Sequence, residues 1–99
     1  MLENKEEKKH IDHDERGNPL MTLKTIQYYC SEENVSKAPD LCEKLYLQSK
    51  GFKTIENLEN YANLVGLWLN SNSICKISGL ESLKNLTCLY LHYNSISKI

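Results

Sequence analysis

Residues 64–85 of the chain read LVGLWLNSNSICKISGLESLKN. Their apolar side chains fit neither the 3.6-residue period of a helix nor the two-residue period of a strand. Counted from Leu64 as position 1, leucine or isoleucine stands at positions 1, 4, 6, 11, 14, 17 and 20, and asparagine stands at position 9. The same spacing recurs from Leu86 onward and, less completely, from Cys42 onward. Three successive units therefore share one register.

This spacing is typical of the leucine-rich repeat, in which an L-x-L strand is followed by an asparagine. It predicts an α/β leucine-rich repeat solenoid whose short parallel strands form the concave face. We place the repeats at residues 42–63, at 64–85 and, incompletely, at 86–99. Because alternate strand residues share a face, both leucines of each L-x-L pair should point into the core. The pairs are Leu45 and Leu47, Leu67 and Leu69, and Leu89 and Leu91.

The asparagine of each unit, Asn72 or Asn94, stands at the bend after the strand. A buried amide must find hydrogen-bond partners, and the backbone groups exposed at a bend supply them. Repeated asparagine at this position therefore predicts a structural ladder. The first unit has Lys50 there, which cannot accept a hydrogen bond, so this unit should lie near one end of the stack.

The segment 1–19 carries four basic and six acidic side chains and few aliphatic ones. Such a composition buries too little apolar surface to offset the entropy of ordering, so it predicts a disordered charged tail over residues 1–19. An alternative is a metal cluster, since imidazole and carboxylate groups are metal ligands. Its ligands would be His10, Asp12, His13, Asp14 and Glu15.

Residues 20–41 are predicted to form an N-terminal cap helix and a loop. Apolar residues recur there every three to four positions, and Thr22 is available as the N-cap. The helix should cover the open end of the first repeat, although it is alternatively a partner-binding helix itself. The residues of its apolar side are Leu20, Leu23, Ile26 or Gln27, and Cys30.

Composition narrows the function classes. Twelve basic and thirteen acidic side chains indicate neither a nucleic-acid nor an anionic-membrane partner. No stretch is apolar enough to cross a bilayer and no secretory signal precedes the repeats, which predicts a cytoplasmic protein. The cysteines form no CxxC pair and should be free thiols, with a disulfide or zinc site as the less favoured alternative. They are Cys30, Cys42, Cys75 and Cys88.

No motif of catalysis occurs: the sequence has no Gly-rich phosphate loop, no HExxH and no nucleophile elbow. Cys88 and His92 share a strand face, but their backbones should lie roughly 13 Å apart, which is too far for a thiol–imidazole pair. We therefore expect a non-enzymatic protein without a cofactor.

The positions between the core leucines should point outward onto the concave face. One column is aromatic in all three units: Tyr46, Trp68 and Tyr90. Stacked aromatics on adjacent strands stabilise a sheet, and an exposed aromatic column with polar flanks is also typical of a protein-binding hot spot. Both interpretations are compatible. The candidate protein-binding residues are Tyr46, Gln48, Trp68, Asn70, Tyr90 and His92, with Lys44, Gly66 and Cys88 beside them.

The third unit stops at Ile99, position 14 of 22, without a following cap. Arrays of this kind need about three repeats, so we expect a truncated C-terminus, and a fragment whose parent carries further repeats or a piece completed by a partner. Apolar side chains of the last unit should then be exposed. They are Leu86, Leu89, Leu91, Ile96 and Ile99.

The unit resembles the short leucine-rich repeat class that includes a nuclear regulator of protein phosphatase 1 and ciliary proteins. A longer string, LYLxxKGFxxIENLExYxxLxxLWLxSNxIxKI, begins at Leu45. It is similar to the start of the dynein axonemal assembly factor 1 family, also called the leucine-rich repeat-containing protein 50 family, and the resemblance runs from Met21 to Ile99. One departure is the pair Ser78-Gly79, where the unit before has Glu56-Asn57.

The resemblance implies a protein-interaction scaffold for cytoplasmic preassembly of dynein arms, associated with the cilium or flagellum. It implies dynein arm subunits or assembly chaperones as partners, and leaves the oligomeric state open. The alternative is a phosphatase-regulatory or other general scaffold of the same repeat class. Nucleic-acid binding would need a basic groove, whereas eight basic and seven acidic residues follow from Leu20 onward.

Overall fold

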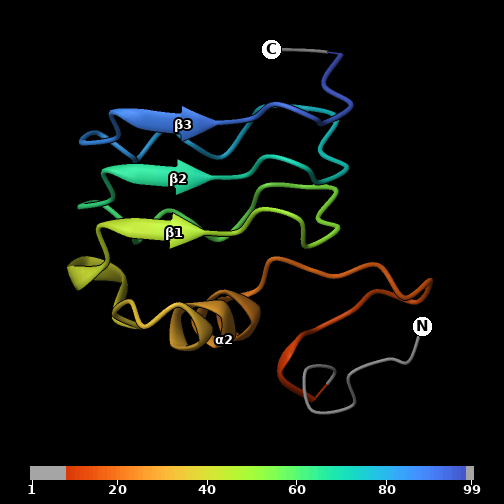
Figure 1. Cartoon of the computed structure of the whole chain (residues 1–99), viewed down its shortest axis with the longest axis horizontal. Coiled ribbons are helices and arrows are strands. Elements are labelled where there is room, and N and C mark those ends of the chain that lie inside the picture. Colours follow the sequence, from red (N-terminus) through yellow and green to blue (C-terminus); the bar gives the residue numbers. More distant parts are fainter. Residues whose placement is uncertain (1–8, 98–99) are drawn as a thin grey trace.

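The computed structural model describes residues 9–97 of the 99-residue chain. The strands form a parallel sheet in the order β1-β2-β3, and α2 lies beside β1 at one end of the stack (Figure 1). In chain order the elements are helix α2 (Leu23–Glu32), the 3₁₀ helix η1 (Pro39–Leu41), and strands β1 (Lys44–Tyr46), β2 (Gly66–Trp68) and β3 (Cys88–Tyr90).

The register of the sheet equals the period of the sequence, because Leu45 pairs with Leu67 and Leu67 pairs with Leu89. The backbone N–H of Leu47 donates to the carbonyl of Trp68, and the N–H of Leu69 donates to the carbonyl of Tyr90, both at 2.9 Å. After β1 and again after β2, the chain returns behind the sheet and enters the next strand (Figure 1). This α/β arrangement is compatible with a leucine-rich repeat fold.

The leucines that were predicted to point inward from the first two strands are at most 1% exposed. Hydrophobic residues from the returning segments form the opposite wall of the same core, so no unit buries its apolar side chains alone. The core leucines are Leu45, Leu47, Leu67 and Leu69, and the wall includes Phe52, Ile55, Leu58, Tyr61, Leu64 and Ile74.

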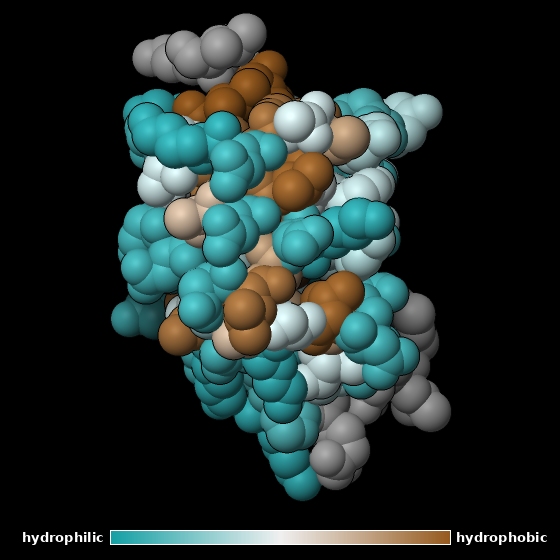
Figure 2. All heavy atoms as spheres, turned by 90° about the vertical axis from the view of Figure 1, so that its left-hand side faces the viewer, coloured by the Kyte–Doolittle hydropathy of each residue, from teal (hydrophilic) through white to brown (hydrophobic). Residues whose placement is uncertain are grey.

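Burial decreases in the third unit, as the sequence predicts. Leu89 is 39% exposed, whereas its equivalent Leu67 is fully buried. Leu86, Leu91 and Ile96 are only partly buried, and Ile99 lies outside the described residues. Figure 2 shows hydrophobic side chains at the end of the molecule that carries β3.

The predicted asparagine ladder is present. The side-chain oxygen of Asn72 accepts the backbone N–H groups of Lys50 (3.0 Å) and Phe52 (3.1 Å), and its amide nitrogen donates to the carbonyls of Leu47 (2.9 Å) and Leu69 (3.0 Å). One side chain thus binds its own unit and the one before. Asn94 repeats the pattern with Ile74, Leu69 and Leu91.

The turns repeat with the same period. Ser49, Ser71 and Tyr93 have φ values of 57°, 60° and 60°, and each directly precedes the ladder position. Asn57 and Gly79 are likewise equivalent, with φ values of 64° and 74°. Since asparagine and glycine are the residues that best tolerate this left-handed conformation, the change from Glu56-Asn57 to Ser78-Gly79 preserves the turn.

Helix α2 begins as predicted, with the Thr22 hydroxyl accepting the backbone N–H of Thr25 at 3.3 Å. The buried face differs from the expected one, because Leu23 is 44% exposed while Ile26, Tyr29 and Cys30 are buried. Ile26 and Cys30 are buried as predicted, whereas Leu23 is replaced on the buried face by Tyr29. The residues along this face are Thr25, Ile26, Tyr29 and Cys30.

The prediction of a disordered charged tail differs from the structure over residues 9–19, and residues 1–8 lie outside the described part. Ile11 is 5% exposed and joins the core. Asp12 accepts the Thr22 hydroxyl at 2.6 Å, which lowers the pKa of this carboxyl, and its backbone N–H donates to Thr25 at 3.0 Å. One aliphatic side chain and one helix N-terminus thus anchor a segment whose composition alone predicts disorder.

We predict that Asn72→Ala lowers the free energy of unfolding by about 3 kcal/mol, because part-buried backbone groups of two units lose their partners. Urea-induced unfolding followed by circular dichroism measures the change. Asn94→Ala is the matched control and should cost less, because the third unit is more exposed. Equal losses in the two variants would contradict the view that the burial of the asparagine contacts between units determines their contribution to stability.

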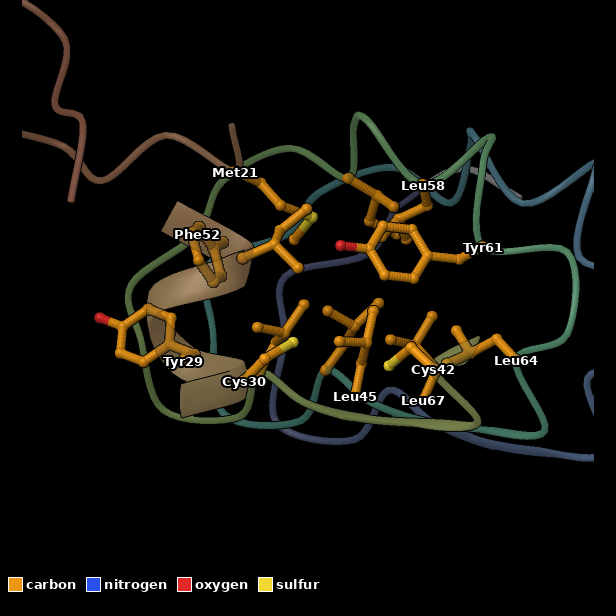
Figure 3. Close-up of a cluster of buried hydrophobic side chains, with 14 of the residues drawn as sticks. Met21, Tyr29, Cys30, Cys42, Leu45, Phe52, Leu58, Tyr61, Leu64 and Leu67 are labelled. Atoms are coloured by element: carbon orange, nitrogen blue, oxygen red, sulfur yellow. The ribbon is translucent and has the colours of Figure 1, made fainter. Parts of the chain in front are cut away.

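Tyr61 is fully buried, and its hydroxyl points into the core cluster (Figure 3) without a hydrogen-bond partner among the described residues. Burial raises the pKa of this phenol. We predict that Tyr61→Phe increases the free energy of unfolding by about 1 kcal/mol, because it removes an unsatisfied polar group and keeps the ring. Tyr93→Phe, at a position that is 80% exposed, should change nothing. A destabilised Tyr61→Phe variant would count against this account.

Candidate protein-binding face

The structure brings the predicted column together on the sheet. Tyr46 pairs with Trp68 and Trp68 with Tyr90 in the strand register. Beyond the strands the same alignment continues, since the N–H of Ser49 donates to the carbonyl of Asn70 (3.1 Å) and that of Ser71 to the carbonyl of His92 (3.0 Å). We call this surface the aromatic face. It consists of Lys44, Tyr46, Gln48, Gly66, Trp68, Asn70, Cys88, Tyr90 and His92.

The three rings form a continuous stack. The centroids of Tyr46 and Trp68 lie 4.6 Å apart with planes inclined by 29°, and those of Trp68 and Tyr90 lie 5.1 Å apart at 19°. These distances match the usual spacing of about 4.8 Å between neighbouring strands, so the sheet itself sets the stacking distance. The two faces of Trp68 are covered by its neighbours, and Tyr90 at the end of the stack is 40% exposed.

Gly66 makes room for the central ring. A Cβ atom at this position would lie 2.7 Å from Cζ3 and 3.0 Å from Cη2 of Trp68. The indole therefore lies over the glycine two residues earlier in the same strand. The sequence pattern placed Gly66 on the face without assigning it this role, although a glycine between Lys44 and Cys88 in one column is the signal that could have revealed it.

The aromatic cluster extends beyond the predicted residues at the β3 end. His92 packs edge-on to Tyr90 at 6.3 Å and to Tyr93 at 5.0 Å. Tyr93 is 80% exposed and has a φ of 60°. Tyr93 is not part of the predicted column, and the left-handed turn after the strand brings its ring beside His92.

Hydrogen-bond donors dominate the polar groups of the aromatic face. The side-chain oxygens of Gln48 and Asn70 are buried and have no partner among residues 9–97, so their amide nitrogens are the atoms that reach solvent. Lys44 is exposed and forms no ion pair within the same range. None of the nine positions is a carboxylate. The face is therefore rich in donors and carries a positive charge from Lys44.

The other candidate groups do not converge on a reactive site. The Cys88 thiol contacts the Thr87 hydroxyl at 4.0 Å, whereas the His92 ring contacts tyrosines, so thiol and imidazole are not brought together. In the described part of the chain no three His, Cys, Asp or Glu residues are placed to hold a metal ion. A shallow hollow of about 410 Å³ on α2, lined by Lys24, Gln27 and Lys37 among others, lies apart from the aromatic face.

The four cysteines are free thiols. Cys30 and Cys42 are buried, and a hydrogen bond between their side chains raises the pKa of Cys30, together with burial, and lowers that of Cys42. Cys75 and Cys88 are exposed. Within residues 9–97 no helix is long and apolar enough to cross a membrane.

No family model matches the chain. Dynein axonemal assembly factor 1 of Rattus norvegicus is 47% identical over 58 residues, which are 59% of this chain and 9% of that protein. The Homo sapiens protein of the same name is 46% identical over 51 residues, or 52% of this chain and 7% of that protein. A Drosophila erecta homologue is 46% identical over 53 residues, or 54% and 4%.

The chain thus spans less than a tenth of the length of these curated relatives. Rodent, human and insect proteins with one name match about half of it at nearly the same identity. Over this matched part, the chain is similar to dynein axonemal assembly factor 1 of these organisms, which supports its assignment to that family.

Proposed function

We propose that the chain is a non-enzymatic leucine-rich repeat solenoid that acts as a protein-interaction scaffold in the assembly of axonemal dynein. The observation that carries the proposal is the in-register stack of Tyr46, Trp68 and Tyr90, together with relatives whose name describes dynein assembly. Aromatic residues with exposed polar edges are the side chains that most often dominate protein interfaces.

The proposal includes where the protein works. We place it in the cytoplasm of ciliated or flagellated cells, where dynein arm subunits or assembly chaperones would be its partners. No cofactor enters the proposed activity, because binding to another protein needs only the side chains of the face.

A further part of the proposal concerns the units. The short strands, the asparagine ladder and the shared core repeat with one common period, as expected for coils of a solenoid. The exposed leucine of the third unit would be covered by a further coil in a longer protein. These observations support the repeat assignment.

We predict that Trp68→Ala leaves the fold intact and reduces the capture of axonemal dynein subunits from the cytosol of ciliated cells at least tenfold. Removal of a central aromatic anchor typically costs an interface about 2 kcal/mol or more. The measurement is quantitative mass spectrometry of proteins bound to the immobilised 99-residue chain. Leu41→Ala, at a site that is 68% exposed and outside the face, is the matched control. Equal capture by wild type and Trp68→Ala would remove the face from the proposal.

The same repeat class is also compatible with a phosphatase-regulatory or other general scaffold. Loss of the gene in a ciliated cell separates the two functions. Cilia that are immotile and lack dynein arms support the assembly role. A phosphatase or cell-division defect with normally motile cilia would replace it with the alternative.

A further inference from the structure

The aromatic face differs from the rest of the chain in charge. Acidic and basic residues are nearly balanced overall, thirteen against twelve. The nine positions of the face contain one lysine, one histidine and no carboxylate. Since carboxylates make up more than half of the charged side chains elsewhere, the face offers an anionic group a surface without carboxylates of its own.

The stack also determines which ring atoms a partner can reach. Each neighbouring pair of rings is nearly parallel at 4.6 and 5.1 Å, so the two faces of Trp68 are occupied by tyrosines. A nucleic-acid base needs an open aromatic face to stack on. The polar atoms at the ring edges are Tyr46 Oη, Trp68 Nε1 and Tyr90 Oη, and none of them bonds another residue within 9–97.

The side-chain amides beside the stack also favour a partner that accepts hydrogen bonds. Because the side-chain oxygens of Gln48 and Asn70 are buried, these two residues offer their N–H groups outward. Trp68 Nε1 is a donor only, and the Lys44 ammonium is a donor only. A partner that satisfies this set must supply hydrogen-bond acceptors along the direction from β1 to β3.

We propose that the aromatic face binds an acidic, extended segment of a protein partner, whose carboxylates accept hydrogen bonds from the ring edges and amides and pair with Lys44. This inference rests on the proposed function and specifies the chemistry of the partner. The three stacked rings cover a length that about three to four residues of an extended chain would span. A segment in which glutamate or aspartate alternates with small residues fits this spacing, because alternate side chains share one face.

The experiment uses an acetylated decapeptide of alternating glutamate and serine, and a matched peptide with glutamine in place of glutamate. Trp68 is the only tryptophan in the chain, so its fluorescence reports binding at the face. The glutamate peptide should change the emission in a saturable way and bind at least tenfold more tightly than the glutamine peptide. Affinity should fall as salt is added, because the ionic contacts are exposed. Equal binding of both peptides would overturn the proposal.

Variants assign the contacts. Lys44→Gln and Tyr46→Phe should each weaken the glutamate peptide three- to tenfold, measured by fluorescence anisotropy of the labelled peptide. Tyr46→Phe removes one hydroxyl and keeps the stack. Lys84→Gln removes an exposed lysine outside the face and should have no effect. If Lys44→Gln and Lys84→Gln behave alike, the attraction is not located at the face and the proposal fails.

A single-stranded decathymidine tests the other anionic class and should not compete with the glutamate peptide. Tighter binding of decathymidine than of the peptide would overturn the acidic-protein proposal in favour of nucleic acid.

The proposed function is tested separately. If Trp68→Ala loses dynein subunits but the glutamate peptide does not bind, the scaffold role stands and the acidic partner is rejected. If the peptide binds but capture is unchanged, the face recognises acidic segments and the dynein role is rejected.

Discussion

The side-chain amide of Asn72 satisfies backbone groups of two coils at once, and this contact fixes how one coil sits on the next. The Asn72 side chain accepts the N–H groups of Lys50 and Phe52 and donates to the carbonyls of Leu47 and Leu69, which directly follow β1 and β2. The bend itself leaves these backbone groups without partners, and burying them unpaired would lower the free energy of unfolding. Because Asn94 makes the equivalent contact one unit later, successive units are held at the same spacing.

The aromatic face follows from that spacing. Side chains at equivalent positions are brought to about one strand separation, which is also a suitable distance for stacked rings. The stacking contacts stabilise the sheet and also arrange the three rings as one surface, formed by Tyr46, Trp68 and Tyr90. Cross-strand pairs of this kind contribute roughly 0.2–1 kcal/mol each to stability. Because stacking uses the ring faces, it is compatible with the proposed binding through the ring edges.

Periodic features could be predicted from the sequence because each obeys a local rule: Leu67 and Leu69 alternate inward, and Asn72 caps a bend. Features that depend on one contact between distant segments could not. Ile11 joins the core although its neighbours are charged, and Lys50, which breaks the ladder, lies 4.4 Å from the ring centre of Tyr29 on α2. The composition of residues 9–19 does not show that a single isoleucine can anchor them. The repeat pattern likewise does not predict what a lysine does when it stands at the asparagine position.

Gly66 shows why the face has the form it has. A side chain there would displace the Trp68 ring, whose Cζ3 atom lies 2.7 Å from where a Cβ would stand. With glycine, the indole can lie along its own strand and keep both faces against Tyr46 and Tyr90. The two faces of Trp68 are therefore covered by the tyrosines, and its N–H group remains at the ring edge. Under the proposed binding mode, specificity at this surface depends on hydrogen-bond acceptors and charge in the partner, because both faces of Trp68 are already covered.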